Sequence, residues 1–139
     1  MPAANLNLGI EKGAAWQPPT FTLYQGGSLV NLTGYTATLE ILTSQNGGTP
    51  LATLTSGSGL TLGGALGTIV ATLSAAATAA LNTAALSQVP VTIQYGTDSS
   101  GNPFYFTGLP AAFVLSIASG GVVTYVAKGV MAISNFAQV

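Results

Sequence analysis

The sequence predicts an all-β domain, an antiparallel β-sandwich of jelly-roll-like form with about eight strands and one short alanine-rich helix. Three observations lead to this fold class. Apolar and polar residues alternate with a period of two through most of the chain. Glycine-rich turn signals separate the alternating runs, and one segment has helical spacing instead.

The alternation is clear in several runs. Leu6, Leu8 and Ile10 alternate with polar or small residues, and Val123, Tyr125 and Ala127 are expected to share one face of the last strand pattern. The runs, in chain order, span residues 5–10, 20–24, 35–41, 51–55, 59–62, 67–73, 89–95, 112–117 and 122–127, and the pattern resumes around Met131 and Ile133.

Short turn signals lie between these runs. Glycine there supplies positive φ, and Asn, Asp and Ser form local hydrogen bonds. Pro90 has no N–H, so the strand over 89–95 is expected to lie at a sheet edge or to begin at this residue. The turns are "QGG" (25–27), "NGGTP" (46–50), "SGSG" (56–59), "LGG" (62–64), "TDSSGNP" (97–103) and "SGG" (119–121).

One helix is expected. Ser74 is a good N-cap for a helix over 75–87, with Ala77, Leu81 and either Ala84 or Ala85 on the face that packs against the sheet. The uncharged stretch 65–81 resembles a membrane span in hydropathy, but it is short, rich in alanine and threonine, and without basic flanks. A strand followed by a short helix is the better interpretation.

The chain is expected to form a single domain over residues 1–139, with an N-terminal arm of about residues 1–15. The opening "MPAANLNLGIEKG" has neither the basic start nor the apolar run of a signal peptide. No composition shift indicates a linker.

Charged residues make up 4% of the 139 residues, against about 25% in ordinary soluble domains. Two lysines cannot neutralise a phosphate track, so nucleic-acid binding is excluded as a function class. A net charge of −1 weakens repulsion between copies, which suits a subunit that assembles. The full set of charged residues is Glu11, Lys12, Glu40, Asp98 and Lys128.

Five charged side chains offer few candidate groups for catalysis or metal binding. Without histidine, acid–base chemistry would need a carboxylate pair such as Glu11 with Glu40, or Glu40 with Asp98, and no motif supports either pair. A serine–lysine dyad with Lys12 or Lys128 lacks a motif as well. The loop around Asp98 offers oxygens for calcium but only one carboxylate. We therefore expect no enzyme, no metal site and no cofactor.

The aromatic residues allow more than one interpretation. Trp16, in "GAAWQPPT", either covers the core or anchors the chain to a partner, because tryptophan is common at binding hot spots. The run Phe104-Tyr105-Phe106 is expected to be a strand with the core on one side and Tyr105 on the other, and the alternative is a sugar-stacking platform. The expected partner contacts are Leu6, Leu8, Ile10, Trp16, Phe136 and Val139.

Three segments carry a resemblance to a known family: "LVNLTGYTATLEIL" (29–42), "GTIVATLSAAATAAL" (67–81) and "VPVTIQY" (89–95). Their order resembles that of tailed-phage virion proteins, in which a "DLTGYT" strand precedes a glycine-led strand, an "LSAAATAAL"-type helix and a further strand. The chain departs at Asn31, where an aspartate is more usual, and in the final strands, "VVTYVAKGVMAIS", which lack the expected charges.

Within that family, the size and low charge look most like a capsid-cementing, or decoration, protein of a podophage of the Bordetella phage type. The resemblance implies a jelly-roll-like sandwich, a homodimer, and binding to the major capsid protein on the outer surface of the virion. A tail or baseplate module of the same fold is the first alternative, and a carbohydrate-binding β-sandwich is the second. An uncharged surface agrees with the virion interpretation, because charges buried between neighbours cost desolvation.

Overall fold

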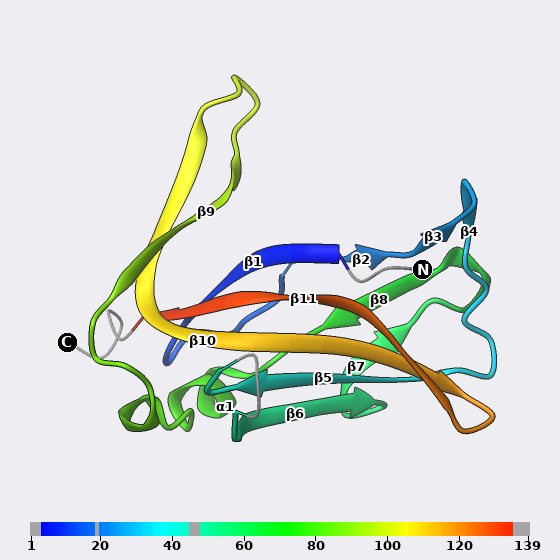
Figure 1. Cartoon of the computed structure of the whole chain (residues 1–139), viewed down its shortest axis with the longest axis horizontal. Coiled ribbons are helices and arrows are strands. Elements are labelled where there is room, and N and C mark those ends of the chain that lie inside the picture. Colours follow the sequence, from blue (N-terminus) through cyan, green and yellow to red (C-terminus); the bar gives the residue numbers. More distant parts are fainter. Residues whose placement is uncertain (1–3, 19, 45–47, 135–139) are drawn as a thin grey trace.

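The computed structural model describes residues 4–18, 20–44 and 48–134, which form mostly strands (Figure 1). Three short helical segments accompany them: η1 (Gly64–Leu66), α1 (Ala75–Ala79) and η2 (Thr83–Ala85). The strands are β1 (Ala4–Glu11), β2 (Phe21–Thr22), β3 (Tyr24–Gln25), β4 (Ser28–Leu29), β5 (Thr36–Leu42), β6 (Pro50–Ser56), β7 (Gly59–Leu62), β8 (Thr68–Ala71), β9 (Val91–Thr97), β10 (Pro103–Ser119) and β11 (Val122–Ser134).

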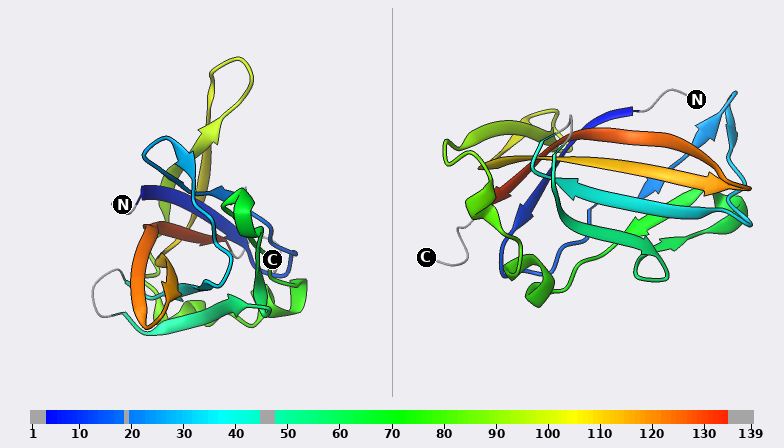
Figure 2. Two further views of the ribbon diagram at one scale, coloured as in Figure 1. Left: turned by 90° about the vertical axis from the view of Figure 1, so that its right-hand side faces the viewer. Right: turned by 60° about the horizontal axis from the view of Figure 1, so that its bottom comes forward.

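The strands join into one curled sheet with the order β1-β11-β10-β5-β6-β7-β8-β2, and β9 pairs with β10 beside this path. Seen from the end in the left panel of Figure 2, the sheet curls round so that its two end strands come to the same side. The predicted all-β class with about eight strands and one short α-helix is confirmed. A separate two-stranded hairpin is formed by β3 and β4.

The sheet is mixed, whereas the sequence predicted an antiparallel one. Most neighbours are antiparallel, but β1 runs parallel to β11 over eight paired positions, and β6 runs parallel to β7 over two. A long parallel pair needs a long connection, and almost the whole chain separates β1 from β11, whereas the short β6–β7 contact forms across the turn between these two strands. Residues 4–11 of the predicted N-terminal arm therefore belong to the sheet of the chain itself.

The core lies inside the curl, where the inward positions of the strands meet. Leu8 and Ile10 of β1 are buried there with Leu39 of β5 and Phe113 of β10. Burying such side chains stabilises the fold by about 1.5–3 kcal/mol each, and the period-two alternation places them on the face of the sheet that lines the inside of the curl.

The long strand β10 changes partners at Gly108. Residues 103–108 pair with β9, and from Leu109 onward the strand pairs with β11 and then also with β5. A Cβ atom at Gly108 would lie 2.7 Å from the backbone carbon of Ile133, so only glycine lets β10 pass this close to β11. The hairpin of β9 and the first half of β10 consequently projects from the body (Figure 1).

The predicted alternation of the last strand is wrong at one point, because β11 contains a β-bulge. The register moves from Leu115 opposite Ala127 to Ser116 opposite Tyr125, which leaves Val126 as an extra residue. A bulge of this kind turns two successive side chains to one face. Val126 and Ala127 are both buried, and Tyr125 is exposed instead of sharing a face with Ala127.

The predicted helix is confirmed at its start and shorter than expected. The Ser74 hydroxyl accepts a hydrogen bond from the N–H of Ala77 at 3.1 Å, as an N-cap should. The α-helix ends at Ala79 with Ala80 as its C-cap, and Asn82 has non-helical dihedrals. Leu81 is buried, while Ala84 and Ala85 are exposed. No helix in the described parts of the chain has the length and hydropathy to cross a membrane.

Candidate partner-binding surfaces

The structure places the predicted contact residues mostly inside the chain's own core. Leu8, Ile10 and Trp16 are buried in the core, and of these three only Leu8 also lines the pocket described below. Leu6 is 38% exposed and remains accessible. The other two predicted contacts, Phe136 and Val139, lie outside the described residues.

Trp16 takes the first of its two predicted roles and covers the core. Its backbone N–H donates to the carbonyl oxygen of Leu73 at 2.9 Å, and the return bond from Leu73 has the same length. Its indole Nε1 donates a buried hydrogen bond to the carbonyl oxygen of Gly9, also at 2.9 Å. Trp16 therefore joins the segment that precedes β2 to the edge of β1 that faces away from β11.

That edge of β1 presents unpaired backbone groups over Asn5 and Asn7. Backbone groups on a strand point alternately to its two sides, and the carbonyl of Gly9 points away from β11 toward Trp16. The N–H and C=O of Asn5 and Asn7 therefore point the same way. Within residues 4–18, 20–44 and 48–134, no strand pairs with this edge.

The short strand β2 forms the opposite wall. The N–H of Leu23 donates to the carbonyl oxygen of Gly67 at 2.8 Å, which directs this N–H and the backbone groups of Phe21 toward β8, whereas the carbonyl oxygen of Leu23 accepts from the N–H of Val30 at 3.0 Å. Alternation then turns the N–H and C=O of Thr22 away from β8 and toward β1. We call the space between the edges of β1 and β2 the seam; it is bounded by residues 4–8 and 20–23.

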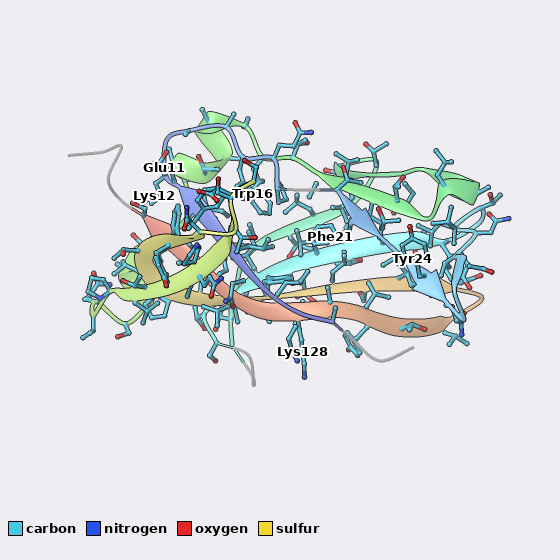
Figure 3. All side chains as sticks on the ribbon, turned by 90° about the horizontal axis from the view of Figure 1, so that it is seen from above. Glu11, Lys12, Trp16, Phe21, Tyr24 and Lys128 are labelled. Carbon is cyan, nitrogen blue, oxygen red and sulfur yellow. The ribbon has the colours of Figure 1, made fainter. Side chains whose placement is uncertain are left out.

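An apolar pocket of about 370 Å³ occupies the seam. Its floor is Val126 and Ala127, the two residues that the bulge in β11 turns inward. Figure 3, seen from above, shows Phe21 on one side of β1 and Lys128 projecting outward on the other. The pocket is lined by Ala4, Leu6, Asn7, Leu8, Thr20, Phe21, Thr22, Leu23, Val126 and Ala127, none of which is charged.

The β9–β10 hairpin is a second exposed surface. Phe104 is 49% exposed and Tyr105 is 65% exposed, so the expectation that one side of this run faces the core fails for Phe104. Only Phe106 is partly buried, with its ring against Gly9, where an added Cβ would lie 2.8 Å from the ring. Residues 104 and 105 follow each other on one strand, so their side chains lie on opposite faces of the hairpin.

The hairpin ends in a turn built around Asp98. The carboxylate oxygen Oδ1 accepts hydrogen bonds from the backbone N–H groups of Ser100 and Asn102, each at 2.9 Å. The bond from Asn102 is the largest cause of a lowered pKa at Asp98, with a smaller contribution from Ser100. This carboxylate is an ionised hydrogen-bond acceptor that shapes the turn, which agrees with the hairpin-loop interpretation.

The far end of the long hairpin formed by β10 and β11 is a third exposed surface. Val122, Val123 and Tyr125 all lie there with more than half of their side-chain surface accessible. Between this end and the projecting hairpin, Glu40 and Lys128 flank Val114 in one cross-strand row on the outer face of the sheet. The apolar end and the charged row are therefore separate.

The candidates for chemistry are scattered over different elements. Glu11 ends β1, Glu40 lies in β5 and Asp98 lies in the hairpin turn. Among the described residues, no group of three or more His, Cys, Asp and Glu side chains is placed to hold a metal ion. Lys12 is buried. Its backbone N–H donates a hydrogen bond of 2.9 Å to the backbone carbonyl oxygen of Ser134.

Comparisons of the chain with protein-family models, with curated proteins and with solved structures gave no significant match.

Proposed function

We propose that the protein is a non-enzymatic structural protein of a tailed-phage virion. In this proposal it is a cementing protein on the outer surface of the capsid, where a homodimer bridges neighbouring major capsid proteins. The virion location and the capsid partner rest on the resemblance of residues 29–42, 67–81 and 89–95 described above. The observation that carries the interaction role is the exposure of large apolar side chains on two separate projections of the fold.

The first projection is the β9–β10 hairpin, with Phe104 and Tyr105, and the second is the end of β11, with Val122, Val123 and Tyr125. Large exposed apolar patches mark surfaces that bind partners, and each projection carries at least two exposed large apolar side chains. Burial of these side chains would contribute about 25 cal/mol per Å² of apolar area. Two such surfaces on different parts of one chain suit a protein that touches two neighbours.

Low charge supports the same role. Asp98 is the one charged residue within the two projections, residues 91–108 and 119–125. A charge buried in an interface loses its hydration and needs an exact partner to compensate, whereas threonine, serine and asparagine lose less. A surface with these residues can be covered by neighbours over most of its area.

Labelling electron microscopy of purified virions tests the proposal. With a label on this chain, we expect label distributed over the whole capsid surface. Label confined to the tail would overturn the cementing role and favour the tail or baseplate alternative, and label absent from virions would overturn both. Tyr125→Lys should reduce the amount of chain on particles, whereas Thr53→Lys, on the exposed face of β6, is the matched control.

Exposed aromatic side chains on the β9–β10 hairpin also favour a second candidate, a carbohydrate-binding module. Sugar rings stack on exposed aromatic faces, but Phe104 and Tyr105 lie on opposite faces of the hairpin and do not form one platform. A glycan array decides between the two. Binding that is lost in Phe104→Ala and Tyr105→Ala but kept in Val122→Ala would favour the carbohydrate function over the cementing one.

A further inference from the structure

We propose that the seam accepts one extended, uncharged segment of another protein, which pairs with the edges of β1 and β2 and places an apolar side chain in the pocket. This inference rests on the proposed function as an interaction protein and goes beyond it by naming the binding mode and the kind of segment. Strand addition of this type takes its affinity from main-chain hydrogen bonds and its selectivity from pockets for alternate side chains.

Both walls of the seam offer the hydrogen-bonding groups that an added strand needs. Asn5 and Asn7 direct their N–H and C=O groups into the seam from β1, and Thr22 does so from β2. At the Gly9 end of β1, the indole Nε1 of Trp16 already donates a hydrogen bond to the carbonyl oxygen of Gly9, so the part of the edge that is free to pair ends at this residue. A strand in the seam would complete the curled sheet by joining β1 to β2, the two ends of its strand order.

The edge of β1 lacks the features that usually prevent such pairing. Natural edge strands are protected by lysine, by proline, by bulges or by inward-pointing charges. From Ala4 to Ile10 the strand has no charged residue and no proline, and its pairing with β11 continues without a register shift. This edge is therefore open to pairing over Asn5 and Asn7.

Charge decides the composition of the segment. None of the ten lining residues is charged, and the backbone groups on both walls are neutral. A charged side chain in the pocket would lose its hydration without gaining an ion pair. The electrostatic complement of the seam is a neutral segment in which apolar residues alternate with small polar ones.

A polypeptide fits the seam better than a small apolar molecule does. The pocket volume of about 370 Å³ lies in the range of about 300–1,000 Å³ that is usual for small-ligand sites, so volume alone does not decide. An apolar molecule would cover the backbone groups of Asn7 and Thr22 without pairing them, and a buried unpaired group is unfavourable. An extended strand pairs these groups and fills the pocket together.

The test uses two capped peptides and the full chain labelled with ¹⁵N. The first peptide, Ac-SLNLNLS-NH₂, is neutral and alternating, and the second, Ac-SLNPNLS-NH₂, has a central proline that cannot donate a hydrogen bond. At peptide concentrations up to about 2 mM, we expect the first peptide to shift the amide signals of Asn5, Asn7 and Thr22, and the second to leave them unchanged.

A matched pair of variants controls for unfolding of the chain and for a general effect of an added surface charge on peptide binding. Leu6→Lys places a charge on the wall of the pocket at an accessible side chain and should weaken binding of the first peptide at least about tenfold. Leu66→Lys adds the same charge in η1, at a more exposed side chain outside the pocket lining, and should leave binding unchanged. The two variants should unfold at about the same denaturant concentration.

Three outcomes would overturn the inference, and a fourth would overturn only the proposed function. No amide shift, or equal shifts with both peptides, means that the seam does not accept a strand. Binding of 1-octanol without binding of the first peptide identifies a small-ligand pocket. Dimerisation of the chain that Leu6→Lys abolishes identifies a second copy as the occupant. Peptide binding together with virions that carry no label would leave the seam intact and refute the cementing role instead.

Discussion

The indole Nε1 of Trp16 donates a buried hydrogen bond of 2.9 Å to the carbonyl oxygen of Gly9, and this bond ties the segment before β2 to the free edge of β1. The contact joins the two ends of the curled sheet at one point, and the pocket lies farther along the same two edges. Trp16 thus determines where the seam ends.

Trp16→Phe should lower the free energy of unfolding by about 1–3 kcal/mol, because the substitution leaves the buried carbonyl of Gly9 without its donor. Denaturant unfolding followed by circular dichroism measures the effect. Tyr24→Phe, which removes a hydroxyl from an exposed ring, should change the free energy by less than about 0.5 kcal/mol. Equal effects in the two variants would show that the indole bond contributes nothing.

Thr78→Val should destabilise the fold by about 1–3 kcal/mol, since threonine and valine have similar shape but only threonine has a hydroxyl. The buried Oγ1 donates to the carbonyl oxygen of Ala14 at 2.8 Å and accepts from the N–H of Gly13 at 3.1 Å. Thermal unfolding against Thr53→Val, at an exposed position, measures the difference. A smaller loss for Thr78→Val than for the control would contradict this contact.

Gly9 and Phe106 should show strong energetic coupling, because a Cβ atom at position 9 would lie 2.8 Å from the Phe106 ring. Gly9→Ala should destabilise the chain by about 1–3 kcal/mol. In a double-mutant cycle with Phe106→Ala, we expect an interaction energy of about 0.5–3 kcal/mol. The cycle with Tyr105→Ala, on the opposite face of the hairpin, should be additive, and coupling in that cycle instead would refute the proposed packing.

The turn of the β9–β10 hairpin should loosen in acid. Hydrogen bonds from Asn102 and Ser100 lower the pKa of Asp98 below its ordinary value of 3.8. A carboxyl group with a lowered pKa in the folded state adds stability above its unfolded pKa and loses that contribution as the pH falls through its folded pKa. The amide signals of Ser100 and Asn102 should therefore move as the pH falls below 3.8.

In Asp98→Asn, the side-chain oxygen still accepts these bonds but does not titrate, so the amide signals should stay constant over the same pH range. Glu40→Gln is the matched control and should keep the wild-type profile. A pH profile that is unchanged in Asp98→Asn would show that another group is responsible.

Local features of the fold were predictable from the sequence, and long-range ones were not. Alternation predicted the strands because each inward residue must be buried, and Ser74 predicted the helix start because its hydroxyl caps Ala77. The predicted length of the helix was wrong, since burial of Thr78 and Leu81 outweighed the helix preference of Ala84 and Ala85.

The seam could not be derived from sequence because it depends on pairing between distant segments. Nothing local shows that residues 4–11 run parallel to β11, or that Val126 is an extra residue that turns two side chains into the pocket. The predicted contacts Leu8, Ile10 and Trp16 were chosen for apolar character, which a core residue and an interface residue share. Only Leu6 combines that character with accessibility among the described predicted contacts.

Retention of the chain on purified particles at increasing salt tests the central claim, a neutral interface, most directly. With at most five charged side chains, the chain should remain on pelleted particles from about 50 mM to about 1 M sodium chloride, where exposed ion pairs are screened. Moderate urea should release it, because urea weakens apolar burial. Steep release by sodium chloride alone would mean that charge holds the protein in place, and would contradict the account.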